Sequence, residues 1–124
     1  MPVSYTIEGE VLHLVMHGEY GPEEIRSRVE EALADPRLPH DVHFLFDTRP
    51  STSLASRSTA ELRDMAGFLG ARSQAFGGRL AMLASEPLHF GLLRMAEVYS
   101  EFAGLQARAF YDEFAALAWL GVER

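Results

Sequence analysis

The chain of 124 residues contains no cysteine. This absence excludes a disulfide framework, a thiolate zinc site and a cysteine nucleophile, and it fits an intracellular protein. The start of the chain, "MPVSYTIEGE", lacks the basic and apolar regions of a secretory signal. The longest apolar run, residues 114–122, is about half the roughly 20 residues that a membrane helix needs. We therefore expect a cytoplasmic protein with no integral membrane segment.

Lysine is absent as well, so the 11 basic residues are all arginines, and they are scattered along the chain. The 18 acidic residues outnumber them and give a formal net charge of −7. Because nucleic-acid backbones are bound by clustered lysine and arginine, this composition argues against a nucleic-acid partner. A local pocket lined by two arginines could still hold a single phosphate group.

Linkers, internal repeats and low-complexity segments are also missing. The composition, with 48% hydrophobic and 23% charged residues, is that of a globular protein that can bury a core without metal or disulfides. We therefore expect a single domain over residues 1–124 that folds without a cofactor.

The pattern of the first third of the chain predicts a hairpin followed by a helix. Apolar and polar residues alternate in "VSYTI" (3–7) and "VLHLVM" (11–16), on either side of a turn at "EGE". In "YGPEEIRSRVEEALAD", Pro22 suits a first helical turn, and apolar residues recur every four positions at Ile25, Val29 and Leu33. This predicts two antiparallel strands and an amphipathic helix.

The rest of the sequence alternates between apolar strands and helices. We expect strands at "VHFLF" (42–46), "RLAMLAS" (79–85) and "QARAFY" (106–111). Helices are expected after Ser58, which has capping-box spacing with Glu61, and also after Pro87 and Asp112. The helix after Pro87 carries a stripe that we expect to be a main anchor of the core: Leu88, Leu92, Met95, Tyr99 and Phe102.

This element order predicts an α/β fold with a mixed, mainly parallel five-stranded sheet, an N-terminal β-hairpin and about four helices. Ligands of such sheets bind beyond the carboxyl ends of the strands. One predicted strand end is Asp47 with the hydroxyl-rich loop that follows it. Another is Ser85 with Glu86, and His89 comes just beyond. A site is therefore expected where these two ends meet.

The element order and three segments, "LFDTRPSTS", "EPLHFGLLRMAEVYSEFAG" and "DEFAALAWLG", resemble the STAS family, named for sulfate transporters and anti-sigma factor antagonists. Over essentially the full chain, the similarity is to the small stand-alone bacterial branch called SpoIIAA-like. The resemblance implies a SpoIIAA/STAS-like fold and a binding function rather than catalysis. Lipid-like ligands have been suggested for the broader fold.

The resemblance also implies a position for regulation. In anti-sigma factor antagonists, a strand-end acid leads to an Asp-Ser-Ser-Gly motif, and a partner kinase phosphorylates a serine there. Asp47 matches the strand-end acid, and "ASRST" stands at the place of the motif without its Asp and Gly. Ser56 and Ser58 are therefore candidates for phosphorylation by position.

The hydroxyl-rich loop has two interpretations. In the first, Ser58 caps the following helix and Asp47 accepts backbone N–H groups at the strand end. In the second, the loop binds a ligand or partner, or carries a phosphoryl group beside Arg49 and Arg57. The residues of the expected binding edge are Asp47, Thr48, Arg49, Ser51, Arg57, Glu86, His89, Phe90 and Leu93.

Catalytic and metal sites are less well supported. Asp47, Ser58 and His89 could form a hydrolase set, but no Gly-x-Ser-x-Gly motif or glycine-rich loop supplies an elbow or an oxyanion hole. His13 and His17 are four residues apart on a strand, which separates them by about 13 Å, too far to share an ion. The sequence therefore predicts no catalytic residue, no metal site and no cofactor.

The helix after Pro87 has more apolar residues than one buried stripe needs, so it is buried on most sides, lines a pocket or forms a dimer contact. The leading hypothesis is a non-enzymatic STAS-like module that engages a partner protein or an apolar small ligand, under control of a phosphorylated loop serine. The alternative is a carrier of a lipid-like ligand, which would contact Leu88, Phe90, Leu92 and Leu93.

Overall fold

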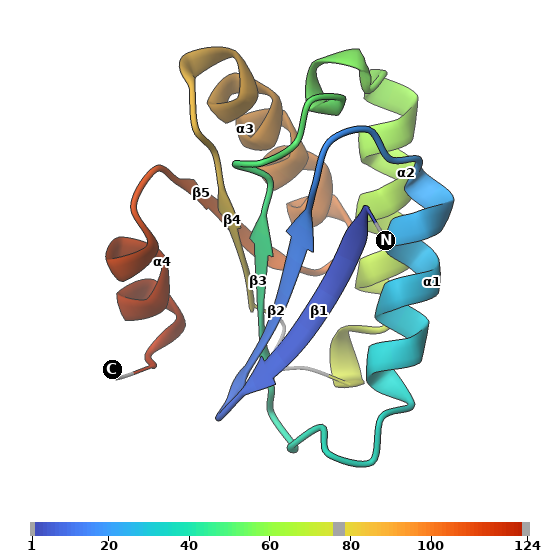
Figure 1. Cartoon of the computed structure of the whole chain (residues 1–124), viewed down its shortest axis with the longest axis vertical. Helices are drawn as coiled ribbons and strands as arrows, with labels where there is room; N and C mark the ends of the chain where they lie inside the picture. The colour runs from blue at the N-terminus through green and yellow to red at the C-terminus, as the bar shows by residue number, and fades with distance from the viewer. Residues whose placement is uncertain (1, 76–78, 123–124) are drawn as a thin grey trace.

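The computed structural model describes residues 2–75 and 79–122. Within these residues, the chain forms one five-stranded sheet and four α-helices, as the sequence predicts (Figure 1). The order is β1 (Val3–Glu8), β2 (Val11–Met16), α1 (Pro22–Leu33), β3 (His43–Asp47), η1 (Leu54–Ser56), α2 (Thr59–Gly70), η2 (Ser73–Ala75), β4 (Arg79–Leu83), α3 (Pro87–Phe102), β5 (Gln106–Phe110) and α4 (Glu113–Leu120). None of the helices in the described part of the chain is long and apolar enough to cross a membrane.

The sheet is mixed and mainly parallel. β1 pairs antiparallel with β2 across a two-residue turn in which Gly9 has a φ of 59°, a left-handed conformation that glycine adopts without strain. β2, β3, β4 and β5 are parallel, and each strand pairs with the next in chain order. The predicted hairpin and parallel sheet are therefore both confirmed.

The crossover connections decide which face each helix covers. Each parallel strand is added on the same side of the one before it, so right-handed crossovers bring α1, α2 and α3 to one face of the sheet. α4 follows the last strand and packs on the opposite face (Figure 1). The β1–β2 end of that second face carries the exposed residues Ser4, Thr6 and Glu8.

Alternation along the strands builds two hydrophobic cores. In β2, β3 and β4, even-numbered positions contribute to the main core under α1, α2 and α3: Leu12, Leu14, Met16, Phe44, Phe46, Leu80 and Met82. Odd-numbered positions of the same three strands pack against α4: Val11, Leu45, Ala81 and Leu83. Because neighbouring residues of a strand point to opposite faces, the end of β3 sends Phe46 and Asp47 in opposite directions.

The predicted core stripe of α3 is wrong for three of its five members. Leu88, Met95 and Phe102 are exposed, whereas Leu92 and Tyr99 are partly buried. The face that packs on the sheet instead carries His89, Leu93 and Ser100. One face of α3 carries large apolar side chains, and the other carries smaller and partly polar ones. The second face is the one that packs against the sheet.

The C-terminal ends of α2 and α3 approach closely at Gly70. A Cβ atom at this position would lie 2.8 Å from Cβ of Ala103, which is closer than real Cβ atoms come to one another. The absence of a side chain at Gly70 therefore permits the contact between the two helices. This contact helps to fix the relative position of the two helices.

Candidate functional site

The loop after β3 lies at the carboxyl end of the sheet and contacts both faces. Asp47, the last residue of β3, points to the α4 face. Thr48 follows and lines a cavity on the other face with Phe46. The Thr48 hydroxyl donates to the carbonyl oxygen of Leu83 at 2.6 Å, which ties the ends of β3 and β4 together. The predicted binding edge is thus divided between two sides of the sheet.

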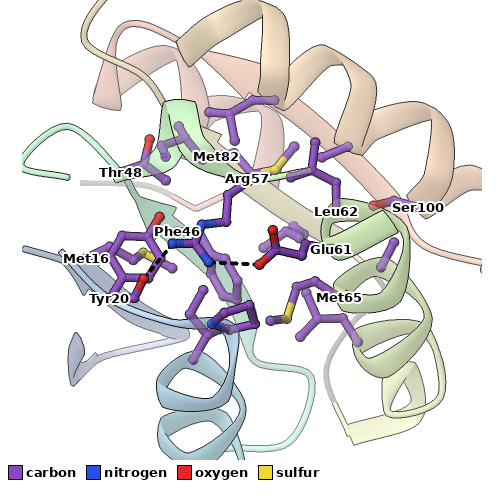
Figure 2. Close-up of a pocket in the computed structure, with 18 residues that line it drawn as sticks. Met16, Tyr20, Phe46, Thr48, Arg57, Glu61, Leu62, Met65, Met82 and Ser100 are labelled. Atoms are coloured by element: carbon purple, nitrogen blue, oxygen red, sulfur yellow. Dashed lines mark hydrogen bonds and ion pairs between the residues drawn. The ribbon is translucent and has the colours of Figure 1, made fainter. Parts of the chain in front are cut away.

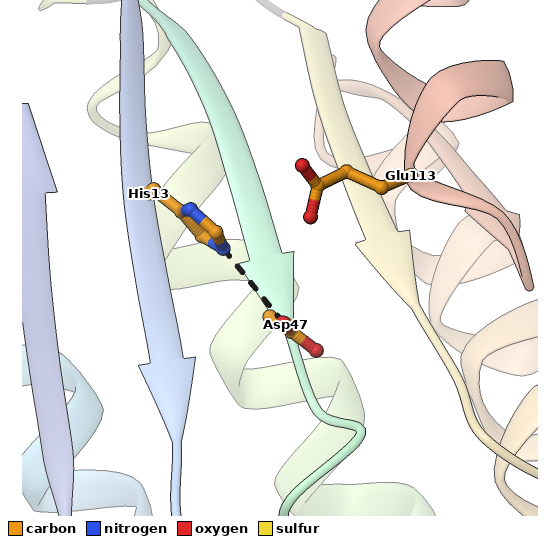
Figure 3. A group of neighbouring side chains, drawn as sticks. All are labelled: His13, Asp47 and Glu113. Atoms are coloured by element: carbon orange, nitrogen blue, oxygen red, sulfur yellow. Dashed lines mark ion pairs between the residues drawn. The ribbon is translucent and has the colours of Figure 1, made fainter. Parts of the chain in front are cut away.

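On the α4 face, Asp47 is the centre of a charged cluster. Its carboxylate accepts hydrogen bonds from Arg49 through the backbone N–H (3.0 Å), Nε (2.9 Å) and Nη2 (2.8 Å). Nη2 of Arg49 also contacts the carboxylate of Glu113 at the start of α4, at 3.2 Å. Nε2 of His13 on β2 lies 3.8 Å from the Asp47 carboxylate (Figure 3). The cluster connects the loop, the sheet and α4.

The electrostatics of this cluster favour an ionised Asp47. Burial alone would raise the pKa of the Asp47 carboxyl, but the neighbouring His13 ring and the hydrogen bonds from Arg49 hold it well below its usual range. The same contact with Asp47 raises the pKa of the Arg49 guanidinium. Asp47 therefore acts as a fixed negative charge at neutral pH, and its polar groups are engaged within the protein.

Ligand atoms of His13, Asp47 and Glu113 lie within 4.8 Å of one another, a spacing that could suit a metal ion. However, the guanidinium of Arg49 already contacts both carboxylates. A divalent cation at this place would have to displace or repel that positive charge. The arrangement is therefore better described as an ion-pair network than as a metal centre.

Sequence reasoning missed the role of His13 in this cluster. It considered His13 only with His17, which is exposed at the end of the hairpin. The available signal was the alternation of side chains along the two adjacent strands. His13 and Asp47 both have odd numbers, which in the observed register places them on the same face of the sheet. Using that signal requires the register of β2 against β3, in which His13 pairs with Leu45.

The hydroxyl groups of the loop mostly serve the local structure. Ser51 Oγ accepts from the backbone N–H groups of Ser53 and Leu54, at the start of η1. Ser53 Oγ accepts from the N–H of Tyr20 at 3.2 Å, which joins the loop to the segment before α1. These serines are buried. Their hydrogen bonds hold the loop together and join it to the segment before α1, so Ser51 is a structural residue in this arrangement.

Ser56 and Ser58, the candidates for phosphorylation, are exposed. Ser58 Oγ accepts from the N–H of Glu61 at 3.1 Å, and Glu61 Oε1 accepts from the N–H of Ser58 at 3.0 Å. The predicted capping box at the start of α2 is therefore confirmed. Ser56 Oγ donates to the carbonyl oxygen of Ser53 at 2.6 Å.

On the three-helix face, an apolar cavity of about 80 Å³ lies between the sheet, α2 and α3 (Figure 2). Its wall includes three methionines, Met16, Met65 and Met82, and apolar residues from every surrounding element. The other lining residues are Tyr20, Pro22, Ile25, Phe46, Thr48, Leu54, Arg57, Glu61, Leu62, Ala66, Leu69, Leu80, Leu93, Ala96 and Ser100. Few of the lining residues are polar, and Arg57 and Glu61 are the charged ones.

Arg57 lies in this wall with its guanidinium between Tyr20 and Glu61 (Figure 2). Nη2 donates to the carbonyl oxygen of Tyr20 at 2.7 Å, and Nη1 donates to Glu61 at 3.0 Å. Nε is buried and has no hydrogen-bond partner among the described residues. An unsatisfied buried donor costs free energy, so this N–H group lacks the compensation that a hydrogen bond would provide.

The structure separates the predicted binding residues into three places. Thr48, Arg57 and Leu93 line the cavity together. Asp47 and Arg49 belong to the ion-pair network on the other face. Glu86, His89 and Phe90 lie at the start of α3, where Nε2 of His89 is 3.3 Å from Glu86 and the Phe90 ring stacks on Tyr111 at 4.4 Å between centroids.

The residues predicted for a lipid-like ligand do not form one wall. Of the four, Leu93 lines the cavity, but Leu88 is exposed and Phe90 stacks on Tyr111. Leu92 packs against the main core without lining the cavity. The four side chains are separated because α3 faces the sheet through a different side than its apolar stripe indicates. The cavity draws half of its lining residues from α2 and the strands instead.

The hydrolase set is not assembled. Asp47 interacts with Arg49 and His13, Ser58 with Glu61, and His89 with Glu86. Among the described residues, no hydrogen bond joins any two of Asp47, Ser58 and His89. A general base has to reach its nucleophile directly or through one water, so these three side chains lack the geometry of a triad.

Comparisons with known proteins agree with this architecture. Neither protein-family models nor curated protein sequences give a match. Among solved structures, the chain is similar to an uncharacterized protein of the DUF3478 family from Shewanella loihica PV-4, described as having a SpoIIAA-like fold. The TM-score is 0.59 and the sequence identity 22%, over 95% of this chain and 91% of that one. The chain has a SpoIIAA-like fold.

This finding confirms the fold implied by the segments that resemble STAS proteins. In the SpoIIAA-like fold of this chain, the cavity is bounded by the sheet and by the three crossover helices, and α2 and α3 contribute most of the helical residues. The ion-pair network lies on the opposite side of the sheet, under α4. Of these two places, the cavity has room for a ligand, whereas the network is filled by its own side chains.

Proposed function

We propose that the protein is a STAS-like binding module, without enzyme activity of its own, that holds a small and largely apolar ligand in the cavity between the sheet, α2 and α3. The observation that carries the proposal is an apolar cavity whose lining residues include Arg57, a side chain with an unpaired buried donor at Nε. Ligand sites commonly combine an apolar surface with a few polar groups that fix orientation.

The volume of the cavity limits what enters it. At about 80 Å³ it is roughly half of the about 150 Å³ of an engineered apolar cavity that binds benzene. A short alkyl or small cyclic group fits such a space, and a larger ligand would leave its remaining atoms at the opening. The three methionines of the wall would help the cavity to accept ligands of different shapes, because methionine side chains adjust to irregular shapes.

The charge balance of the wall indicates the polar part of the ligand. The Arg57 side chain already has an ionic partner in Glu61, at 3.0 Å. An anionic ligand would be attracted by Arg57 and repelled by Glu61, so a neutral oxygen acceptor suits the Nε donor better. Burial raises the pKa of Tyr20, which keeps its phenol neutral beside Arg57. The expected ligand class is therefore a small ketone, ester or ether with an alkyl end.

The first experiment is native mass spectrometry of the protein purified from its own cells, compared with the same sample after denaturation. A mass that is lost on denaturation would identify the ligand. The second uses isotope-labelled methionine methyl groups, because Met16, Met65 and Met82 line the cavity whereas Met95 is exposed on α3. Added cyclopentanone should shift the signals of the three cavity methionines and leave Met95 unchanged.

Two substitutions make the test specific. Ala66→Leu, in the cavity wall, should abolish the shifts while preserving the fold, and Ala60→Leu on the exposed side of α2 is the matched control. Arg57→Leu should weaken binding of cyclopentanone by about tenfold or more, because one hydrogen bond to a charged donor contributes roughly 1.5–3 kcal/mol. It should leave binding of methylenecyclopentane, which lacks the acceptor, unchanged. Equal shifts in the wild type and Ala66→Leu would refute the proposal.

A second candidate function is binding of a protein partner under control of loop phosphorylation. The observation that favours it is the exposure of Ser56 and Ser58, in contrast to the buried Ser51 and Ser53. Phosphopeptide mapping of the protein from its own cells tests it directly. Phosphate found at neither serine under any growth condition would remove the support for this candidate.

A further inference from the structure

The outer face of α3 carries a continuous apolar stripe that is exposed to solvent. Leu88, Met95 and Phe102 follow one another at seven-residue intervals, and Val98 lies between the last two. Their exposed fractions are 59%, 37%, 88% and 52% for Leu88, Met95, Phe102 and Val98. On a helix of 3.6 residues per turn, this stripe lies opposite the buried His89, Leu93 and Ser100. It therefore faces directly away from the sheet.

Scattered apolar residues are normal on a protein surface, but an aligned stripe of this length is characteristic of a helix that packs against another helix. A spacing of three, four and seven residues is the repeat of a two-helix seam. Gly91 lies in the same stripe, and a Cβ atom at this position would meet nothing within 4 Å. The stripe thus has both projecting side chains and a vacant place for one.

We propose that this stripe is the contact surface for a second copy of the chain, with the two α3 helices packed antiparallel about a two-fold axis. Charge complementarity selects this occupant and this direction. Arg94 and Glu101 flank the stripe on the same side, seven residues apart, and carry opposite charges. In an antiparallel pair, positions on this flank of one helix face the same flank of the other.

The antiparallel pairing matches each flanking charge with its opposite. Arg94 of each copy comes beside Glu101 of the second copy, so the two-fold axis generates the same ion pair twice. A parallel pairing would instead bring Arg94 beside the opposite flank, which carries Leu92 and Tyr99. The sequence of the flanks is therefore self-complementary only in the antiparallel direction.

The side chains of the seam fit the same register. With Arg94 and Glu101 in contact, Met95 packs against Val98 of the second copy, and Phe102 lies opposite Gly91. The largest exposed side chain thus meets the position with no side chain, which is how knobs fit into holes in a helix pair. The same layer is repeated at the other end of the seam by the two-fold axis.

The contacts of Arg94 and Glu101 within one chain are weak enough to permit an ion pair between two copies. Arg94 has a loose ion pair with Glu97, at 3.6 Å, and its side chain is largely exposed. In the described part of the chain, the Glu101 side chain makes no hydrogen bond or ion pair. Neither residue therefore has to break a strong contact to form the pair between copies.

A contact of one helix on each copy is small. Specific interfaces usually bury roughly 1,200–2,000 Å² in total, and a single pair of 16-residue helices lies at or below the lower limit. The expected dimer therefore dissociates in the micromolar range rather than the nanomolar range. Sedimentation velocity from low micromolar to millimolar protein should show a monomer–dimer transition within that interval.

Charge reversal tests the direction of pairing. Arg94→Glu and Glu101→Arg should each weaken dimerisation by about tenfold or more, because each replaces two ion pairs by two like-charge contacts. The double variant, with both changes in one chain, should restore the wild-type affinity. Arg63→Glu, an exposed arginine of α2, is the matched control and should leave dimerisation unchanged.

Mixing the two single variants gives a second readout. One has only glutamate and the other only arginine at the flanking positions, so their mixture should form heterodimers more strongly than either forms homodimers. Phe102→Ser should abolish dimerisation without affecting monomer stability, since this side chain is 88% exposed.

Either of two results would overturn the proposal. A monomer at every concentration would show that the stripe does not pair two copies of the chain. A dimer that is equally insensitive to Arg94→Glu and Arg63→Glu would show that the copies meet elsewhere or in another direction.

Discussion

Replacing Asp47 by asparagine should lower the free energy of unfolding by about 2 kcal/mol at neutral pH. The Asp47 carboxylate is buried, and Arg49 donates three hydrogen bonds to it. Hydrogen bonds to a charged group contribute roughly 1.5–3 kcal/mol, and loss of one partner of a fully buried ion pair costs about 3–5 kcal/mol. The Arg49 side chain is 38% exposed, so water can solvate its guanidinium after the carboxylate is removed. The expected loss of unfolding free energy therefore lies nearer the lower of these two ranges.

The effect should depend on pH with a definite sign. The pKa of Asp47 is lowered in the folded protein, so the charged form favours folding. This contribution is fully present above the unfolded pKa, about 4, and is lost as the pH falls toward the folded pKa. The asparagine side chain of the variant has no group that titrates in this range. The difference in stability between the wild type and Asp47→Asn should therefore be constant at neutral pH and shrink below about pH 4.

Urea denaturation at a series of pH values measures this difference. Asp64→Asn, on the exposed side of α2, is the control for a changed net charge and should cost less than about 0.5 kcal/mol. The reasoning fails if Asp47→Asn is as stable as the control. It also fails if the difference persists unchanged at pH values well below 4, because the ion pair would then not be its source.

Substitutions at two further positions test the helix ends. Ser58→Ala should lower the free energy of unfolding by about 1 kcal/mol through loss of the N-cap, whereas Ser58→Asp, an equally good cap, should leave it within a few tenths. Thermal unfolding of both variants checks this, and equal losses would contradict the capping role. Gly70→Ala should cost about 1–3 kcal/mol because the new Cβ meets Ala103, and unchanged stability would mean that the helices move apart without cost.

Most of the fold could be predicted from the sequence because its patterns are local. Alternation in "VSYTI" and "VLHLVM" gives the hairpin, and the continuous apolar segments ending at Asp47 and near Leu83 give the buried parallel strands. Ser58 with Glu61 defines the start of α2 through residues three positions apart. Each of these signals involves neighbours within about one helical turn, and each was confirmed.

The candidate site was less predictable because it depends on packing between elements. The cavity results from the spacing of α2 and α3 above the sheet, which no periodicity encodes, although its residues Arg57 and Leu93 were both expected to bind. The ion-pair network needs the register of β2 against β3 and the position of Glu113 on α4. Single residues such as Asp47 were found, whereas their partners across the fold were not.

α3 illustrates why an apolar stripe does not identify the buried face. The stripe with Leu88, Met95 and Phe102 has the larger side chains, yet the face with His89 and Ser100 packs on the sheet. A right-handed crossover has to lay the helix across β4 and β5, and the connection lengths fix which side turns inward. Periodicity therefore predicts that α3 is a helix with an apolar stripe, and it leaves the partner of that stripe open.

Because the two faces of α3 point in opposite directions, the two proposals can be tested independently on one protein. Leu93 and Ala96 contribute to the cavity wall, whereas Phe102 belongs to the outer stripe. Ala66→Leu in α2 fills the cavity without touching the stripe, so it should abolish ligand binding and leave dimerisation intact. Phe102→Ser should do the reverse. A variant that changed both would indicate that ligand binding shifts α3 itself, and would couple the ligand to self-association.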